Sequence, residues 1–412
     1  MPHAWPGRRK VAGPLSFTLL AFPFDAFAMK KLATVLILSL ICLSASAGKP
    51  GHEAAVSAMF ADSGALGMVV VTVQGGQIEV YGRGETRPGS GQVPDGQSLV
   101  RIGSGSQVLT AEVLARLVAE GKLGLDDTLQ QHAGEGRVVP RTAGVPEITL
   151  LDLATHVSGL PRGVSSGPPK YAAPFAWPGA AVRWGELKDG KTDAAPRTEA
   201  VYSNAGYDLL GDALASAGGA PYTELLARLV TSPLQMNDTT ATPTPAQCAR
   251  LMSGPDLDNS GPCGATTATA ASSGLFSTPL DMAVWLRKLV SVVPPAPSTC
   301  MVLKPWVTRA AMPVMKGFDF PGPADALGLG WVRLGDGQQA RSPIWHKTGS
   351  GAGFMSYTAI LPAPRSAVFI VVNKVDMKML PRLTRAGNAL LRQLGQEMHE
   401  LVGSQFDQQP CP

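Results

Sequence analysis

The sequence predicts one discontinuous α/β domain that is interrupted by a helical one. β-rich segments stand near both ends of the chain, and the loop-rich section between them holds the clearest helical segments. The composition supports a large core, because 45% of the 412 residues are apolar and only 16% are charged. We therefore expect an α/β part built from both ends of the chain, with the helical part inserted.

The first elements are a predicted hairpin and a predicted helix. Residues 66–89, LGMVVVTVQGGQIEVYGRGETRPG, give two β-rich runs around Gly75 and Gly76, which is typical of a hairpin. The helix that follows should end near Gly121, and its buried face is predicted from apolar residues at helical spacing: Leu109, Val113, Leu114, Leu117 and Val118.

The remaining elements follow the same two patterns. Helices are expected in residues 148–163, 202–219 and 277–293. Strands are expected in residues 326–335, 353–364 and 366–375, and a final amphipathic helix at about 380–402. These elements place a single domain at residues 48–402, with an α/β part at about 58–103 and 325–402, a helical part at about 104–324, and a tail at 403–412.

The first 47 residues are interpreted as a leader and signal peptide. Residues 29–47, MKKLATVLILSLICLSASA, combine two lysines, an apolar stretch and a small-x-small ending, as secretory signals do. Cleavage is expected near Ala47, and residues 1–28 read as an extension in front of a second start at Met29. The sequence therefore predicts a periplasmic protein.

The charge balance of the mature chain argues against two classes of partner. The leader holds five of the 35 basic and one of the 31 acidic residues, so 30 of each remain. A neutral chain without a basic run offers no electrostatic basis for binding nucleic acid or anionic lipid. After cleavage no apolar span of 18 residues remains, so we expect no membrane span.

Four cysteines remain after cleavage, an even number that suits an oxidising compartment. Cys248 and Cys263 flank a short loop, and a disulfide between them would contribute roughly 3 kcal/mol by chain entropy. Cys300 with Cys411 is the second expected pair, with free thiols as the alternative. Their spacing fits no zinc site.

Three motifs occur in a meaningful order along the chain. Ser104 opens the first predicted helix, Tyr202 and Asn204 belong to a YSN motif, and Lys347 begins a Lys-Thr-Gly motif. Each alone is weak, because a serine at a helix start is usually an N-cap and Lys-Thr-Gly is usually a turn. Together, in this order, they are the parts of the penicillin-recognising serine acyl-transferases.

The flanking sequence strengthens that comparison. EGKLGLDD, ITLLDLATHVSGLP and ADALGLGWV resemble the class C β-lactamase and D,D-peptidase superfamily. YGRGETRPG, AVYSNAGYDLLGDALA, PLQMNDTTATPTPAQCARLM and HKTGSGAGF resemble the AmpH-type D-alanyl-D-alanine carboxypeptidase/endopeptidases, over about residues 58–395. The resemblance implies an antiparallel sheet flanked by helices with an inserted helical domain, substrates among peptidoglycan peptides and β-lactams, and no cofactor.

The resemblance also implies roles for the site residues. Acyl transfer from an amide needs a nucleophile, a base, donors for the oxyanion and an acid for the leaving amine. Ser104 would be the nucleophile, and the N–H groups of Ser104 and Ser350 would form the oxyanion hole. Tyr202 would act as base and then as acid. Lys347 would make the Tyr202 phenol more acidic and attract a substrate carboxylate.

The other site residues would bind substrate. Asn204 is expected to hydrogen-bond the substrate amide or the residue at position 107. Thr348 and Gly349 are expected to leave room for substrate along the edge of the strand.

Gln107 departs from the family pattern, which has lysine three residues after the nucleophile. Residues i and i+3 share a helix face, so that lysine would lie against the serine oxygen. Glutamine fits a similar volume but can neither accept the proton nor lower the pKa of Tyr202 by charge. Three functions stay open: an AmpH-like hydrolase, a pseudo-enzyme that only binds muropeptides or β-lactams, and a class C-like β-lactamase or esterase.

Other chemistry is not supported by the motifs. Residues 349–353, GSGAG, follow Lys347 where a phosphate loop would have its lysine after the second glycine. His156 and His346 lack carboxylate partners at metal-ligand spacing, so we expect no metal site. We assign His156 to helix packing and His346 to strand positioning.

Overall fold

The computed structural model describes residues 49–163, 179–190, 192–254, 263–291, 295–335 and 343–402. The predicted leader, signal peptide and cleavage site lie outside the described residues, as do the tail at 403–412 and Cys411, the predicted partner of Cys300. The described residues belong to one compact unit, Ser46–Pro412.

The described chain contains both kinds of element in the predicted order, but the helix expected at 148–163 covers only Leu150–Ala154, and the strand expected at 326–335 is divided into Ala324–Leu327 and Val332–Leu334. The helices are α2 (Pro50–Ser63), α3 (Ser106–Ala119), α4 (Leu150–Ala154), α5 (Ala180–Lys188), α6 (Asn204–Gly218), α7 (Tyr222–Leu226), α8 (Pro245–Cys248), α9 (Pro279–Ser291), α10 (Pro297–Val302) and α11 (Leu380–Val402). The strands are β1 (Gly67–Gln74), β2 (Gln77–Gly84), β3 (Val100–Arg101), β4 (Ala200–Val201), β5 (Phe276–Ser277), β6 (Val307–Thr308), β7 (Met315–Lys316), β8 (Ala324–Leu327), β9 (Val332–Leu334), β10 (Ile344–Gly351), β11 (Phe354–Leu361) and β12 (Ser366–Val372).

An eight-stranded sheet joins the two ends of the chain in the order β2-β1-β12-β11-β10-β9-β8-β6. Every neighbouring pair in it is antiparallel. The predicted hairpin is confirmed as β1 and β2, and its turn consists of Gly75 and Gly76 with φ of 57° and 95°. Two positive φ angles suit the tight turns that match strand twist, which explains the glycine pair. The predicted antiparallel sheet is confirmed.

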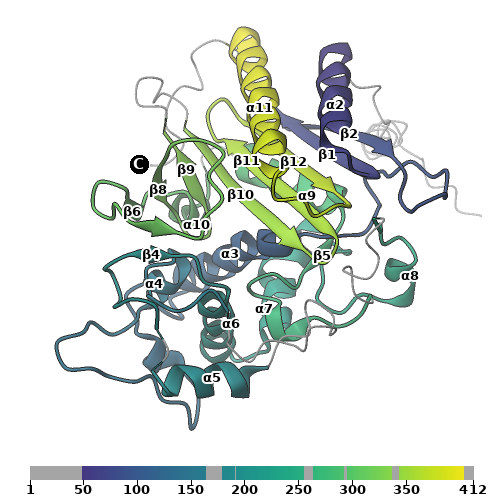
Figure 1. Ribbon diagram of the computed structural model, residues 1–412. Helices are drawn as coiled ribbons and strands as arrows, with labels where there is room; N and C mark the ends of the chain where they lie inside the picture. Colours follow the sequence, from purple (N-terminus) through teal and green to yellow (C-terminus); the bar gives the residue numbers. More distant parts are fainter. Residues whose placement is uncertain are drawn as a thin grey trace, which may run out of the picture. The chain divides into compact units, whose positions relative to one another are not determined.

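The sheet separates two cores because its strands are apolar on both faces. From β1, Met68 and Val70 pack with α2 and α11, whereas Val69 and Val71 pack with the helical part and α9. Figure 1 shows α2 and α11 next to one another over the sheet. The long buried runs of β1, β11 and β12 are expected for a sheet covered on both sides.

Helix α3 is the central element below the sheet (Figure 1). Eleven of its 14 residues are buried, including Leu109, Val113 and Leu114, as the apolar spacing predicted. Ser104 precedes the α-helix and lies in a single 3-10 turn, η1 (Gly103–Gly105). This turn is pressed against β10 and β11 and fixes where the serine points.

Three further observations complete the fold. The predicted disulfide between Cys248 and Cys263 is confirmed. Strand β6, at Val307–Thr308, lies upstream of the boundary expected near residue 325, yet it pairs with β8 in the large sheet. Helix α9 also lies upstream of that boundary and covers one face of the sheet. The α/β part therefore includes segments from the middle of the chain. Among the described helices, none is both long and apolar enough to cross a membrane.

Candidate active site

Two glycines allow the Ser104 turn to touch strand β10. Gly103 has φ of +54°, and a Cβ there would stand 2.9 Å from the Ser350 nitrogen. A Cβ on Gly349 would stand 2.1 Å from the Ile102 carbonyl oxygen. Real side chains do not fit at such separations, so both positions require glycine. The close approach sets the backbone of Ser104 beside that of Ser350.

Tyr202 is held by the segment between β4 and α6. Ser203 caps α6 through its hydroxyl, which accepts from the Gly206 N–H at 2.8 Å, and Asn204 is the first helical residue. The Tyr202 ring stacks on His156 at 4.6 Å between centroids and meets the edge of Phe318 at 5.6 Å. These contacts fix the ring, so the hydroxyl has a defined position at the base of the site.

Gln107 is the centre of the hydrogen-bond network. Its side chain is fully buried, and its Nε2 donates to the Tyr202 hydroxyl at 2.8 Å and to Asn204 Oδ1 at 2.9 Å. Its Oε1 accepts from Lys347 Nζ at 2.5 Å. Both N–H donors of the amide are therefore used. The predicted contact between Asn204 and the residue at 107 is present.

Lys347 is buried, and its amine has no carboxylate within ion-pair distance among the described residues. Burial lowers its pKa to about 7, with Asp319 raising and Arg162 lowering it to smaller extents. The ammonium also lies over the Tyr202 ring, 4.9 Å from the centroid. Near neutral pH, Lys347 therefore exchanges between amine and ammonium, which suits proton transfer.

The pKa of the Tyr202 phenol differs from the expectation. Burial raises the pKa of Tyr202 to about 12, and the lowering effects of a hydrogen bond with Ser104, the Arg162 charge and the Gln107 hydrogen bond are smaller. The prediction of a more acidic phenol is therefore wrong. Desolvation of the phenolate outweighs the nearby cations in this buried position.

Five of the eight predicted site residues line one open cleft. Ser104, Tyr202, Lys347, Thr348 and Ser350 line it. Gln107 and Asn204 lie behind this wall, and Gly349 packs against the Ser104 turn rather than the cleft.

Sequence reasoning missed several lining residues: Arg162, Phe318, Asp319 and Val332. The Arg162 guanidinium carbon lies 4.8 Å from the centroid of the Tyr202 ring, and its Nη1 donates to the Gly317 carbonyl at 3.0 Å. Arg162 directly follows the ITLLDLATHVSGLP motif, which could have indicated it. Asp319 and Phe318 belong to a loop between β7 and β8, and we find no sequence signal for them.

Both histidines of the site region are buried. His156 Nδ1 accepts from the Ser203 N–H at 3.1 Å, so it supports the tyrosine segment. His346 is buried on β10 and lines the cleft, and burial lowers its pKa to about 3, which keeps the ring neutral. Within the described residues, no group of three or more His, Cys, Asp or Glu side chains could hold a metal ion.

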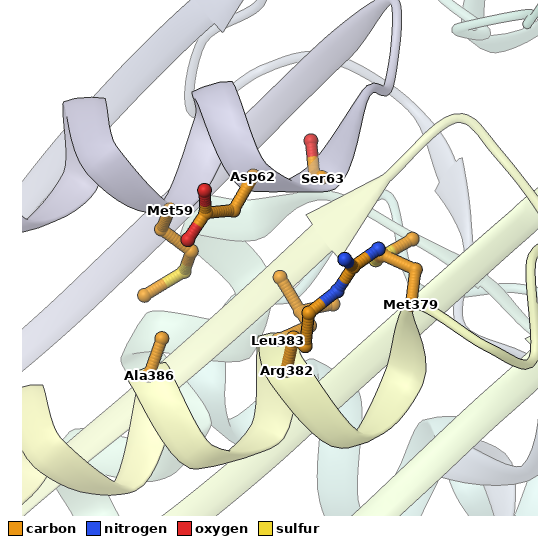
Figure 2. A pocket seen from close by; sticks show the side chains of 7 residues that line it. All are labelled: Met59, Asp62, Ser63, Met379, Arg382, Leu383 and Ala386. Carbon is orange, nitrogen blue, oxygen red and sulfur yellow. The ribbon is translucent and has the colours of Figure 1, made fainter.

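A second hollow, between α2 and α11, differs from the cleft. Figure 2 shows its lining, which comes from these two helices and the residue before α11: Met59, Asp62, Ser63, Met379, Arg382, Leu383 and Ala386. Its one hydroxyl belongs to Ser63, which donates to the Phe60 carbonyl at 2.7 Å and accepts from the Ala65 N–H at 3.1 Å. That serine ends a helix and is not activated.

The comparisons with known proteins agree with this fold and this cleft. The beta-lactamase family model matches residues 52–391, so the chain belongs to the β-lactamase family. The chain is 40% identical to D-alanyl-D-alanine-carboxypeptidase/endopeptidase AmpH of Escherichia coli (strain K12), over 82% of this chain and 86% of that protein. The resemblance to AmpH-type proteins is therefore confirmed.

Two further matches agree with that assignment. The crystal structure of beta-lactamase/D-alanine carboxypeptidase from Yersinia pestis, complexed with citrate, matches with a TM-score of 0.77 and 38% identity. The match covers 83% of this chain and 98% of that one. A beta-lactamase of Pseudomonas fluorescens is 27% identical over 42% of this chain and 45% of its own length.

Proposed function

We propose that this chain is a serine hydrolase that cleaves D-alanyl-D-alanine ends or D,D-cross-links of peptidoglycan peptides and is acylated by β-lactams at Ser104. The observation that carries the proposal is the convergence of Ser104, Tyr202, Lys347 and Ser350 on one cleft. The names of the 40% and 38% identical relatives support the substrate class. The signal-like residues 29–47 and the Cys248–Cys263 disulfide support a periplasmic location.

The pKa values favour a division of roles within the cleft. Lys347, with a pKa of about 7, takes the Ser104 proton as the Oγ–carbonyl bond forms. The N–H groups of Ser104 and Ser350 receive the oxyanion. Tyr202, with a pKa of about 12, is protonated and donates to the leaving amine as the C–N bond breaks, and the Lys347 ammonium then restores its proton. Water hydrolyses the resulting ester.

Gln107 supports one alternative, a protein that binds these ligands and turns them over slowly or not at all. The amide is neutral, fully buried and fully hydrogen-bonded, so it adds no base and no charge beside Tyr202. Loss of a general base typically costs about 10²- to 10⁴-fold in rate. A class C-like β-lactamase or esterase would use the same residues and differ in how fast the acyl-enzyme hydrolyses.

The test is the intact mass of the mature protein after incubation with a β-lactam. We expect a covalent adduct that disappears in Ser104→Ala. Ser106→Ala is the matched control, because its hydroxyl is buried, donates to the Gly103 carbonyl at 2.8 Å and accepts from the Leu275 N–H at 3.2 Å, away from the cleft. An adduct that survives Ser104→Ala would refute the assignment of the nucleophile, and no adduct in the wild type would favour the binding protein.

A further inference from the structure

We propose that Asp319 is a specificity-determining residue that binds a positively charged group on the leaving side of the substrate. The inference rests on the proposed function and concerns the preference of that site among leaving residues: beyond D-alanine, it favours a residue after the scissile bond that carries an ammonium group. Arg162, of opposite charge, lines the same cleft and suits the carboxylate of that residue.

Asp319 stands where a bound ligand can reach it. It lines the cleft with Thr348, whose hydroxyl donates to Asp319 Oδ2 at 3.3 Å. Among the described residues this is the one hydrogen bond that Asp319 accepts, and a carboxylate offers about four acceptor positions. Among the described residues, no lysine or arginine forms an ion pair with Asp319. The half-buried carboxylate therefore has the capacity and the charge to accept an ammonium group from a ligand.

The position of the charges identifies the leaving side. Asp319 and Arg162 line the same cleft as Tyr202 and Lys347. In the proposed reaction Tyr202 protonates the leaving amine, so the leaving residue passes next to these same two charges. Arg162 is further fixed over the Tyr202 ring at 4.8 Å. A cation on the leaving residue is attracted to Asp319, and a carboxylate to Arg162.

The alternative role for Asp319 is to balance the charge of Lys347. In that role Asp319 would change the rate for all substrates by the same factor. Recognition of a substrate cation changes the ratio between two substrates that differ only in that cation. The two roles are therefore distinguished by the ratio of the rates for two substrates, and not by the rate for either substrate alone.

The experiment uses two peptides with the same acyl part, diacetyl-L-lysyl-D-alanyl, and either D-lysine or D-norleucine as the leaving residue. The side chains of the two leaving residues have the same number of carbon atoms, and only the lysine side chain carries an ammonium group. We expect the ratio of kcat/KM for lysine over norleucine to fall about tenfold in Asp319→Asn, which keeps the shape and the acceptor for Thr348.

Asp325→Asn is the matched control. It also removes one negative charge, but Asp325 lies on β8, pairs with Arg333 at 2.8 Å and does not line the cleft. We expect its ratio to equal that of the wild type. An unchanged ratio in Asp319→Asn, or an equal change in both variants, would overturn the inference.

Failure of the proposed function leaves a different signature. In that case the wild type hydrolyses neither peptide and forms no β-lactam adduct. The inference is then read from equilibrium binding of the two peptides to Ser104→Ala, with and without Asp319→Asn. A tenfold loss of preference for the lysine peptide supports the role of Asp319, and equal affinities in both proteins refute it.

Discussion

Two of the buried polar side chains of helix α3, Gln107 and Glu112, have completely different surroundings. Glu112 is 2% exposed and is bound by Lys288, by Arg116 at 3.2 Å and by Trp285 Nε1 at 3.0 Å. Burial alone would raise the pKa of Glu112, but the Lys288 charge and the hydrogen bonds from Lys288 and Trp285 lower it below its ordinary value. Its charge is compensated locally, as in a structural ion-pair network.

At the other end of the same helix, next to the cleft, no opposite charge among the described residues pairs with the buried amine that contacts Gln107. Lys347 meets the neutral Gln107 amide, and burial lowers the pKa of that lysine to about 7. A buried amine without a carboxylate partner is costly for stability and useful for proton transfer. The comparison separates a charge that stabilises the fold from one that is kept for chemistry, and each prediction below tests one side of it.

The largest effect is expected for Lys347→Met. Methionine removes the base and fills a similar volume, so acylation by a β-lactam should fall by about 10²- to 10⁴-fold. The free energy of unfolding at pH 7.5 should rise by about 1–3 kcal/mol, because the desolvation cost of the amine disappears. Single-turnover acylation and urea unfolding measure the two changes.

The pH dependence of the wild type is the control for that variant. Acylation should rise as the pH passes about 7, because Lys347 loses its proton there. Stability should also rise between about 7 and 10.5, since the unfolded chain still binds the proton that native Lys347 has released. Lys347→Met should lack this slope in stability, and a slope equal to that of the wild type would contradict the assigned pKa.

A smaller effect is expected for Glu112→Ala, which should reduce stability and leave acylation almost unchanged. The change removes the buried partner of the half-buried Lys288 and opens a cavity, so the free energy of unfolding should fall by about 3–5 kcal/mol. Acylation per folded molecule should stay within a few-fold of the wild type, because Glu112 does not line the cleft. Equal losses of stability and of acylation rate would show that the two ends of α3 are not independent.

The sequence predicted the elements well where one pattern decided them. Gly75 with Gly76 marked the hairpin, and the spacing from Leu109 to Val118 marked α3. Ser104, Tyr202 and Lys347 were identified from motif order, and the structure brings them to one cleft.

What the sequence did not predict depends on contacts between distant segments. The raised pKa of Tyr202 results from burial by His156 and Phe318, which no local pattern reveals. Asp319 is 29 residues from Thr348 in the chain, and only the folded structure brings its carboxylate within hydrogen-bond distance of the Thr348 hydroxyl. Gly349 was predicted to leave room for substrate along the strand. In the structure, its missing Cβ instead leaves room for the Ile102 carbonyl oxygen.

The smallest of these effects is expected for Gln107→Lys, which brings the cleft closer to the family pattern. The new amine would meet Tyr202 and Asn204, which now accept from the Gln107 amide at 2.8 and 2.9 Å. Acylation and release of D-alanine should both rise by about 10²-fold, because a second base stands beside Ser104. Gln107→Met is the control: it keeps the volume but leaves Lys347 and Asn204 without this partner, so it should give no gain. If Gln107→Lys acylates no faster than the wild type in a single-turnover assay, Lys347 already supplies the base and position 107 only holds it in place.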